Sequence, residues 1–138
     1  FVRSLLGRKC RFDLWEPNLF LSARALPKEE ASIEYGDNIK RAYTYKALNR
    51  LIQSSAADQT KAAMAAVYKD KNKIPLVQIH DELAFSVSDL EEAKELCTIM
   101  ESALQLEVPS PSDISLGPNW GSLTTVDKSD SVPEIKDI

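Results

Sequence analysis

Cysteine, histidine and long apolar runs are scarce in this sequence of 138 residues. Its 2 cysteines, Cys10 and Cys97, are far apart and lack partners at zinc-ligand spacing. Neither a disulfide framework nor a zinc motif is therefore expected, and a reducing compartment is favoured. The single histidine, His80, leaves a nucleophilic triad without support. No apolar run approaches the roughly 20 residues of a membrane span, so a transmembrane protein is excluded.

The chain starts with Phe1 rather than methionine, and no charged region, apolar region and small-residue cleavage site follow it. We therefore expect a piece of a longer protein without a signal peptide. The composition, 43% hydrophobic and 28% charged, is that of an ordinary globular domain or part of one.

Charge is divided unevenly along the chain. Residues 1–61 carry a net charge of +4 and residues 62–138 a net charge of −8, for a total of −4. A basic surface suits an anionic partner such as nucleic acid, and a merely solvated charged surface is the alternative. The basic residues concerned are Arg3, Arg8, Lys9, Arg11, Lys40, Arg41, Lys46 and Arg50.

The N-terminal part predicts a hairpin followed by a loop. Strand-like residues 2–5 and 10–14 flank Gly7, and Trp15-Glu16-Pro17-Asn18 is expected to break the hairpin. Residues 19–36 carry no sustained pattern, apart from a helical turn that Pro27 opens and Gly36 closes, so we interpret them as an inserted loop.

A long helix is predicted next. From an expected N-cap at Asp37, apolar residues recur with a helical period as far as Val67, and an interruption is expected near Ser54-Ser55. Asn49 and Gln53 are four residues apart, so both project beside the apolar stripe. They are either half-buried amides at the border of a core or groups aimed at a ligand along the helix.

A second hairpin is predicted from strand-like residues 76–80 and 83–87, with Asp81-Glu82 as its tip. A two-residue loop favours glycine or asparagine because its backbone needs positive φ, and two adjacent carboxylates repel each other. Mg²⁺, which commonly uses one or two protein carboxylates with substrate phosphates, would compensate them. His80 precedes the pair, and a structural role is the commoner one for a histidine at a strand end. Metal-assisted phosphoryl or nucleotidyl chemistry is compatible with this tip.

The C-terminal part predicts a helix, a strand and a tail. Ser88 and Glu91 form an expected capping box for an amphipathic helix that ends before Pro109, and residues 114–116 suggest a short strand. Residues 122–138 are polar, acidic and unpatterned, which predicts a disordered tail after a domain of residues 1–121. The predicted fold class is α+β, with hairpins packed with long helices.

Four segments, in order, resemble family A DNA polymerases, the DNA polymerase I family. Residues 75–85, P-L-V-Q-I-H-D-E-L-A-F, resemble its C motif, whose core reads Q-V-H-D-E. Residues 47–58 are similar to its N-x-x-x-Q-G-x-A-A-D segment, residues 2–9 to its Y-V-x-T-L-x-G-R-R hairpin, and residues 117–120 to its G-x-N-W ending. The sequence of residues 11–17, R-F-D-L-W-E-P, is similar to that of phage-type members of the family.

The resemblance implies a fragment of a polymerase palm with adjoining fingers elements. Such a fragment belongs to a template-directed DNA polymerase that adds dNTPs to a primer 3′ end by two-metal nucleotidyl transfer. Asp81 and Glu82 would then be catalytic residues and Mg²⁺ ligands, Glu82 less essentially so. His80 would lie near the primer 3′ terminus, and Asn49 and Gln53 would contact primer and template in the minor groove.

The family's second metal-binding aspartate and its nucleotide-binding helix have no counterpart in this sequence. The resemblance therefore implies that the missing N-terminal part of the polymerase supplies them and that this chain alone is inactive. Ser54 and Ser55 stand where the family has glycine and a following residue, and Tyr45 stands where arginine is common. The implied partners are primer-template DNA, dNTPs and the missing part, with no membrane, in the cytoplasm of a bacterium or a phage-infected host cell. A non-catalytic DNA-binding or assembly piece of a split polymerase and a metal-dependent nuclease remain alternatives.

Overall fold

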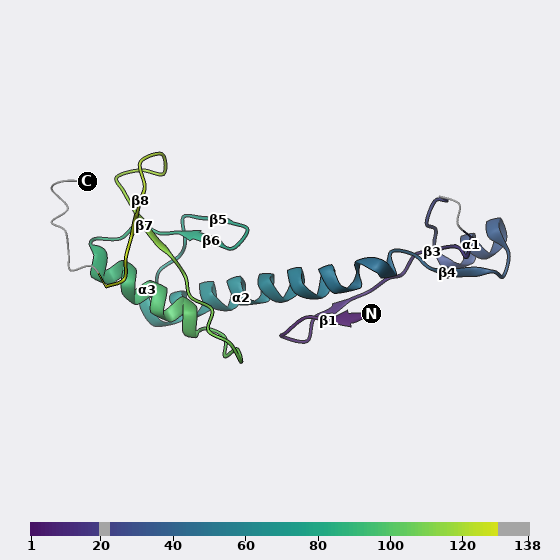
Figure 1. Cartoon of the computed structure of the whole chain (residues 1–138), viewed down its shortest axis with the longest axis horizontal. Helices are drawn as coiled ribbons and strands as arrows, with labels where there is room; N and C mark the ends of the chain where they lie inside the picture. Colours follow the sequence, from purple (N-terminus) through teal and green to yellow (C-terminus); the bar gives the residue numbers. More distant parts are fainter. Residues whose placement is uncertain (20–22, 130–138) are drawn as a thin grey trace. The chain divides into compact units, whose positions relative to one another are not determined.

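The structure is a computed structural model, which describes residues 1–19 and 23–129. Its helices alternate with short antiparallel strand pairs, so the fold is α+β, as predicted (Figure 1). The described residues divide between two units, 1–58 and the part of 59–138 that ends at residue 129, and each unit is described by itself. Within residues 1–19 and 23–129, no helix combines the length and apolarity needed to cross a membrane.

The predicted N-terminal hairpin is present. Strands β1 (Val2–Arg3) and β2 (Lys9–Cys10) pair antiparallel, with Val2 opposite Cys10. Gly7 lies in the turn with φ of 84°, a left-handed conformation that glycine adopts without steric cost. The N–H of Gly7 donates to the carbonyl of Ser4 at 2.9 Å. The hairpin is confirmed, although both strands are shorter than predicted.

A second strand pair occupies the segment in which a break and a loop were predicted. Strand β3 (Trp15–Pro17) pairs antiparallel with β4 (Ile39–Arg41), and helix α1 (Lys28–Tyr35) lies between them in sequence. Trp15-Glu16-Pro17-Asn18 thus lies beyond the first hairpin, as predicted, but it starts a new strand pair, in which Pro17 is tolerated because every strand of a two-stranded sheet is an edge. The helical turn after Pro27 and its end at Gly36 are confirmed. The buried apolar residues here are Phe12, Leu26, Ala31 and Ala42.

The long helix α2 (Ala47–Lys71) starts later than predicted. The expected N-cap at Asp37 was wrong, because the following residues pair as β4 and Tyr43 takes a left-handed backbone with φ of 60°. A 3₁₀ turn, η1 (Thr44–Lys46), leads into the helix. The helix continues through the two serines, whose hydroxyls donate to carbonyls of the preceding turn, from Ser55 to Leu51 at 2.7 Å.

The second unit contains hairpin β5 (Val77–Ile79) and β6 (Glu82–Ala84), followed by helix α3 (Leu90–Ser102). Asp89, not Ser88, is the N-cap of α3, since Asp89 has the extended backbone and its Oδ1 accepts the N–H of Glu92 at 2.8 Å. The carboxylate of Glu92 in turn accepts the N–H of Ser88 at 2.7 Å. The predicted capping box with Glu91 was thus wrong by one residue.

Strand β7 (Ile114–Leu116) confirms the predicted short strand, and it pairs with β8 (Thr124–Val126). The predicted disordered tail of residues 122–138 is thus wrong for Thr124–Val126, because their backbone groups are bonded to β7. Residues 130–138 of that tail lie outside the described residues. A buried cluster joins α3 to β7, and its members are Ala93, Cys97 and Ile114, with Val87 and Leu116 packed against it.

Candidate metal and DNA-contact residues

The β5–β6 hairpin carries the predicted carboxylates at its tip. Ile79 lies opposite Glu82 in the strand register, so the two turn residues are His80 and Asp81. The sequence predicted Asp81-Glu82 as the loop, which was wrong by one residue, because Glu82 already belongs to strand β6. Both carboxylates nevertheless lie at the tip and are exposed, as a group that meets substrate phosphates must be.

The turn obtains its positive φ from histidine. His80 has φ of 54°, a left-handed conformation that a residue other than glycine adopts at an energetic cost. The side-chain amide of Gln78 donates to the carbonyl of His80 at 2.6 Å and stabilises this backbone. The sequence showed that the turn needed positive φ but did not point to Gln78, whose role depends on the folded turn.

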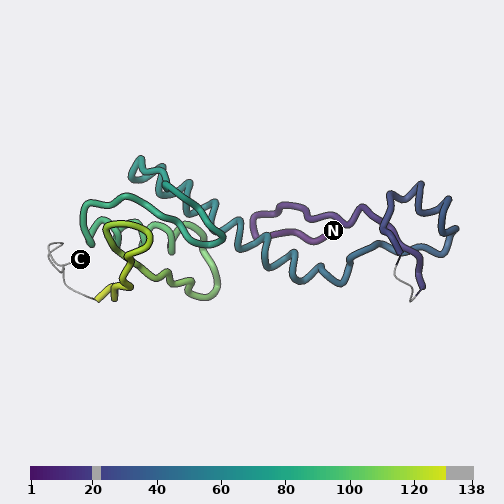
Figure 2. The backbone as a smooth tube through the Cα atoms, turned by 90° about the horizontal axis from the view of Figure 1, so that it is seen from above, coloured from purple at the N-terminus to yellow at the C-terminus, as the bar shows by residue number. Residues whose placement is uncertain are grey.

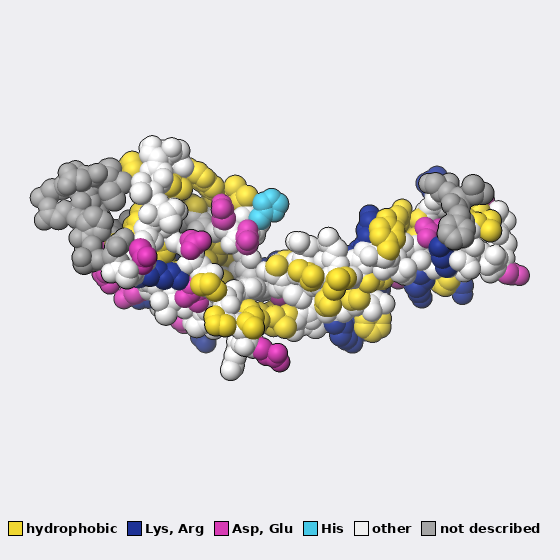
Figure 3. All heavy atoms as spheres, in the orientation of Figure 1, with side chains coloured by type: hydrophobic (Ala, Val, Ile, Leu, Met, Phe, Trp, Pro, Cys, Tyr) yellow, Lys and Arg dark blue, Asp and Glu magenta, His cyan; other side chains and the backbone are white. Residues whose placement is uncertain are grey.

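The chemistry of the tip fits a hard divalent cation in part. Asp81 and Glu82 offer carboxylate oxygens, the ligands that Mg²⁺ prefers, and one or two such groups suffice where phosphates complete the coordination. Across the described residues, no group of three or more His, Cys, Asp or Glu side chains could hold a metal ion. The tip by itself therefore offers two carboxylates and not a complete set of metal ligands. The histidine, cyan in Figure 3, stands out on the surface of this unit.

The two predicted amides lie on α2 in the first unit. Asn49 and Gln53 are both exposed, so the interpretation as half-buried amides at a core was wrong, and both are accessible to a ligand. Beside them, Leu48 is 67% and Ile52 is 56% exposed. Of the five predicted residues, His80, Asp81 and Glu82 are consecutive at the tip of one hairpin, whereas Asn49 and Gln53 share a row of the helix in the other unit.

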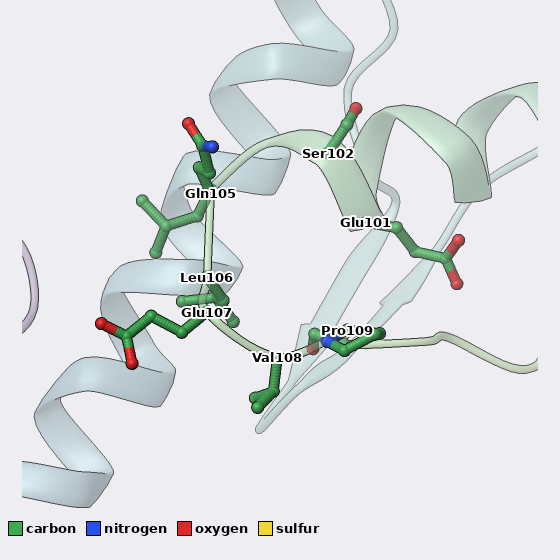
Figure 4. A pocket seen from close by; sticks show the side chains of 9 residues that line it. Glu101, Ser102, Gln105, Leu106, Glu107, Val108 and Pro109 are labelled. Atoms are coloured by element: carbon green, nitrogen blue, oxygen red, sulfur yellow. The ribbon is translucent and has the colours of Figure 1, made fainter.

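A shallow cavity of about 500 Å³ follows helix α3 (Figure 4). Its lining comes from the continuous segment 101–110. The side chains there are a mixture of apolar and polar groups, with Leu106 and Val108 beside Glu101 and Glu107. None of the five predicted site residues lines it, so this cavity has no part in the function proposed below.

Comparison with known protein families matches residues 1–122 to DNA polymerase family A. The chain therefore belongs to the family A DNA polymerases. It is 40% identical over 121 residues to a DNA-directed DNA polymerase of Pseudomonas phage M6, which covers 88% of this chain and 15% of that protein. It is also 36% identical over 122 residues to DNA polymerase I of Mycobacterium leprae, covering 83% of this chain and 13% of that protein.

A third relative, DNA polymerase I of Bacillus subtilis, is 41% identical over 91 residues, which is 60% of this chain and 10% of that protein. The chain thus spans about 15% or less of the length of these three relatives. No solved structure matches it significantly.

Proposed function

We propose that this chain is part of a template-directed DNA polymerase, a nucleotidyltransferase that adds dNTPs to the 3′ end of a primer. The chain would contribute elements of the palm and the adjoining fingers. The observation that carries the proposal is the exposed hairpin tip His80-Asp81-Glu82 within a chain that belongs to family A. The names of the phage and bacterial relatives support it.

In this proposal, Asp81 is the principal Mg²⁺ ligand and Glu82 supports the same site. Metal ions held there would supply Lewis-acid chemistry, which lowers the pKa of the primer 3′ hydroxyl and stabilises the leaving pyrophosphate. Asp81 lies in the turn, where its exposure lets a nucleotide triphosphate approach. His80, the neighbouring turn residue, lies beside the primer 3′ terminus.

Asn49 and Gln53 supply the proposed contacts with primer and template. Their amides both donate and accept hydrogen bonds. The minor groove offers acceptors at similar positions for every correct base pair. Two exposed amides in one helical row are therefore suited to follow a correctly paired duplex without reading its sequence.

A second metal-binding aspartate is required, because one carboxylate pair supplies few ligands for two ions. We propose that it comes from a part of the polymerase that precedes this chain. The three relatives support this, since each extends far beyond the matched residues.

The proposal is tested by primer extension with a complete polymerase that contains this chain. We expect Mg²⁺-dependent extension by the complete protein and neither extension nor DNA cleavage by the 138-residue chain alone. If the complete protein bound primer-template in a salt-dependent manner without extending it, a non-catalytic DNA-binding or assembly role would replace the proposal. Mg²⁺-dependent cleavage of DNA by the chain alone would indicate a nuclease.

A further inference from the structure

We infer that Asp58 is a positioning residue, which anchors the β1–β2 hairpin on α2 and so holds the cations Arg3 and Lys9 for the phosphates of DNA. The inference rests on the proposed function, because the DNA is the one that Asn49 and Gln53 are proposed to contact. Asp58 itself would touch neither DNA nor the reacting atoms.

Asp58 is an acidic residue that is almost fully buried, with 4% of its surface exposed. Its Oδ2 accepts the N–H of Leu6 at 3.2 Å, and its Oδ1 forms an ion pair with the guanidinium of Arg8. Hydrogen bonds from the Ser4 hydroxyl, the Leu6 N–H and Arg8 hold the pKa of Asp58 below its ordinary value. The carboxylate is therefore charged at neutral pH and bonded to three residues of one turn.

The same turn makes further contacts with the same stretch of α2. The N–H of Leu5 donates to the hydroxyl of Ser55 at 3.1 Å. The guanidinium of Arg8 also donates to the carbonyl of Ser54 at 3.2 Å. Residues 4–8 are thus fixed to the helical turn 54–58, and Figures 1 and 2 show the hairpin lying along this half of α2.

The contact continues along one row of the helix. Beyond the hairpin, Arg50 donates to the carbonyl of Arg11 at 2.8 Å, and its guanidinium lies 4.8 Å from the centre of the Phe12 ring. Arg50, Ser54 and Asp58 follow one another at intervals of four residues, so they share one row of α2. The hairpin and the segment after it therefore contact this row, which is buried at Asp58, half-buried at Ser54 and exposed at Arg50.

Asn49 and Gln53 lie on the neighbouring row. Each precedes a member of the contacted row by one residue, and both are exposed. The anchored hairpin thus borders the proposed DNA-contact amides without covering them. An element fixed at that border can present its own side chains to the same duplex.

The cations of the hairpin suit an anionic partner. Arg3 and Lys9 lie directly opposite each other across the two strands, and both are exposed. Like charges in this position repel each other, and bound phosphates would relieve the repulsion. Arg3 donates to the carbonyl of Gly7 at 3.1 Å, and both Arg3 and Lys9 lie over the ring of Phe1, so their contacts stay on the exposed hairpin. Arg8 is different, because its guanidinium is held by the buried carboxylate of Asp58 and by the carbonyl of Ser54. Arg3 and Lys9, rather than Arg8, are therefore the inferred phosphate ligands.

The test uses Asp58→Asn in the complete polymerase, with Asp37→Asn as the control for the same change of charge at an exposed position in the same unit. In Asp58→Asn we expect faster amide hydrogen exchange in residues 4–8 and weaker primer-template binding. The slope of the logarithm of the DNA association constant against the logarithm of the salt concentration should become shallower by about 1 for each phosphate that the hairpin no longer neutralises. Loss of the contacts of both Arg3 and Lys9 would change the slope by about 2. The Mg²⁺ concentration for half-maximal extension should not change.

A second variant keeps the inference testable if Asp58→Asn fails to fold. Ser55→Ala removes the hydroxyl that accepts the N–H of Leu5. It should shift hydrogen exchange, affinity and salt slope in the same direction by smaller amounts. Asp37→Asn should leave hydrogen exchange in residues 4–8 as in the wild type.

Three results would overturn the inference. Unchanged exchange in residues 4–8 would show that Asp58 does not anchor the hairpin. If Asp58→Asn exchanged faster in residues 4–8 but bound DNA with the same affinity and salt slope as Asp37→Asn, Asp58 would anchor the hairpin without positioning cations for DNA. Tighter binding with a steeper salt slope would show that the released Arg8 is itself the phosphate ligand. A wild-type protein that neither bound nor extended primer-template would instead refute the proposed function, while the exchange result would still decide the anchor.

Discussion

Ile79 and Glu82 lie opposite each other across the β5–β6 hairpin, so its turn consists of His80 and Asp81. The two neighbouring carboxylates are therefore not equivalent. Asp81 belongs to the turn, whereas the backbone of Glu82 is held in the strand ladder. This difference leads us to expect different consequences when each carboxylate is neutralised.

Asp81→Asn in the complete polymerase should lower kcat by roughly two to four orders of magnitude and leave primer-template affinity nearly unchanged, because a metal ligand acts mainly as the transition state forms. Glu82→Gln should lower kcat by about tenfold. Single-turnover extension with separate titrations of Mg²⁺ and DNA measures both effects. Asp70→Asn, at an exposed position of α2, is the charge-matched control. A wild-type rate for Asp81→Asn at saturating Mg²⁺ would remove Asp81 from the metal site.

His80→Asn should preserve the hairpin, since asparagine tolerates a left-handed backbone. His80→Val should destabilise it by about 1–3 kcal/mol, because a branched side chain is strained at the observed φ of 54°. Hydrogen exchange of the Leu76 amide, which donates to the carbonyl of Ala84 at 2.8 Å, reports the opening of the hairpin. Ser86→Val, a nearby exposed position, controls for the added bulk. Equal exchange in the two valine variants would argue against strain at His80.

Gln53→Ala should weaken primer-template binding by about 1–3 kcal/mol if its amide is desolvated against DNA, and it should leave the Mg²⁺ dependence normal. Equilibrium binding and extension past a mismatch measure the effect. Gln105→Ala removes an exposed amide from the second unit and should have no effect. If the two variants behaved alike, Gln53 would have no part in the contact with DNA.

The exposed apolar side chains of α2 should make the isolated chain self-associate. Leu48 and Ile52 are four residues apart and more than half exposed, and Figure 3 shows hydrophobic side chains open to solvent over this helix. Leu48→Lys combined with Ile52→Lys should shift sedimentation toward the monomer. The control Ile33→Lys changes a residue of α1 that is 87% exposed, and it should leave the sedimentation of the chain unchanged. A wild-type chain that sediments as a monomer would contradict this expectation.

The start of α3 should lose stability in acid. An ion pair with Lys73 and the N–H of Ser88 hold the pKa of Glu92 below its ordinary value of 4.5. A depressed pKa in the folded state means that the stabilisation is complete above pH 4.5 and is lost as the pH falls through the lower folded value. Hydrogen exchange in the first turn of α3, measured from pH 6 down to about pH 2, should show this loss. In Glu92→Gln, the hydrogen-exchange protection of this turn should change less over the same pH range.

Local residue patterns predicted the elements whose bonds join near neighbours. Gly7 marked the first hairpin, Pro27 and Gly36 bounded α1, and alternating apolar residues marked the strands on either side of Asp81. The position of Asp81 and Glu82 at a hairpin tip was predicted too, because strand-like residues lie on either side of them. The family was recognisable for the same reason, since its motifs are short and contiguous.

Errors arose where a partner distant in sequence decides the local structure. The stretch before Tyr43 has a helical period, yet Ile39–Arg41 forms a strand because Trp15–Pro17 supplies its hydrogen bonds. In the same way, Thr124–Val126 is a strand because Ile114–Leu116 lies beside it. Neither pairing has a local signal strong enough to compete with the periodicity or the polarity of its own segment.

The sequence by itself determined the family, the α+β class and the carboxylates at a hairpin tip, because these depend on residue types at fixed short spacings. The tertiary structure alone decided the role of Asp58. The resemblance places Asp58 at the end of the N-x-x-x-Q-G-x-A-A-D segment, but no residue pattern indicated its contacts with the first hairpin. Its carboxylate accepts the N–H of a residue 52 positions away in the chain. A charged group of this kind can be buried only where folding brings enough donors to replace its lost hydration, and that arrangement exists only in the folded hairpin and helix.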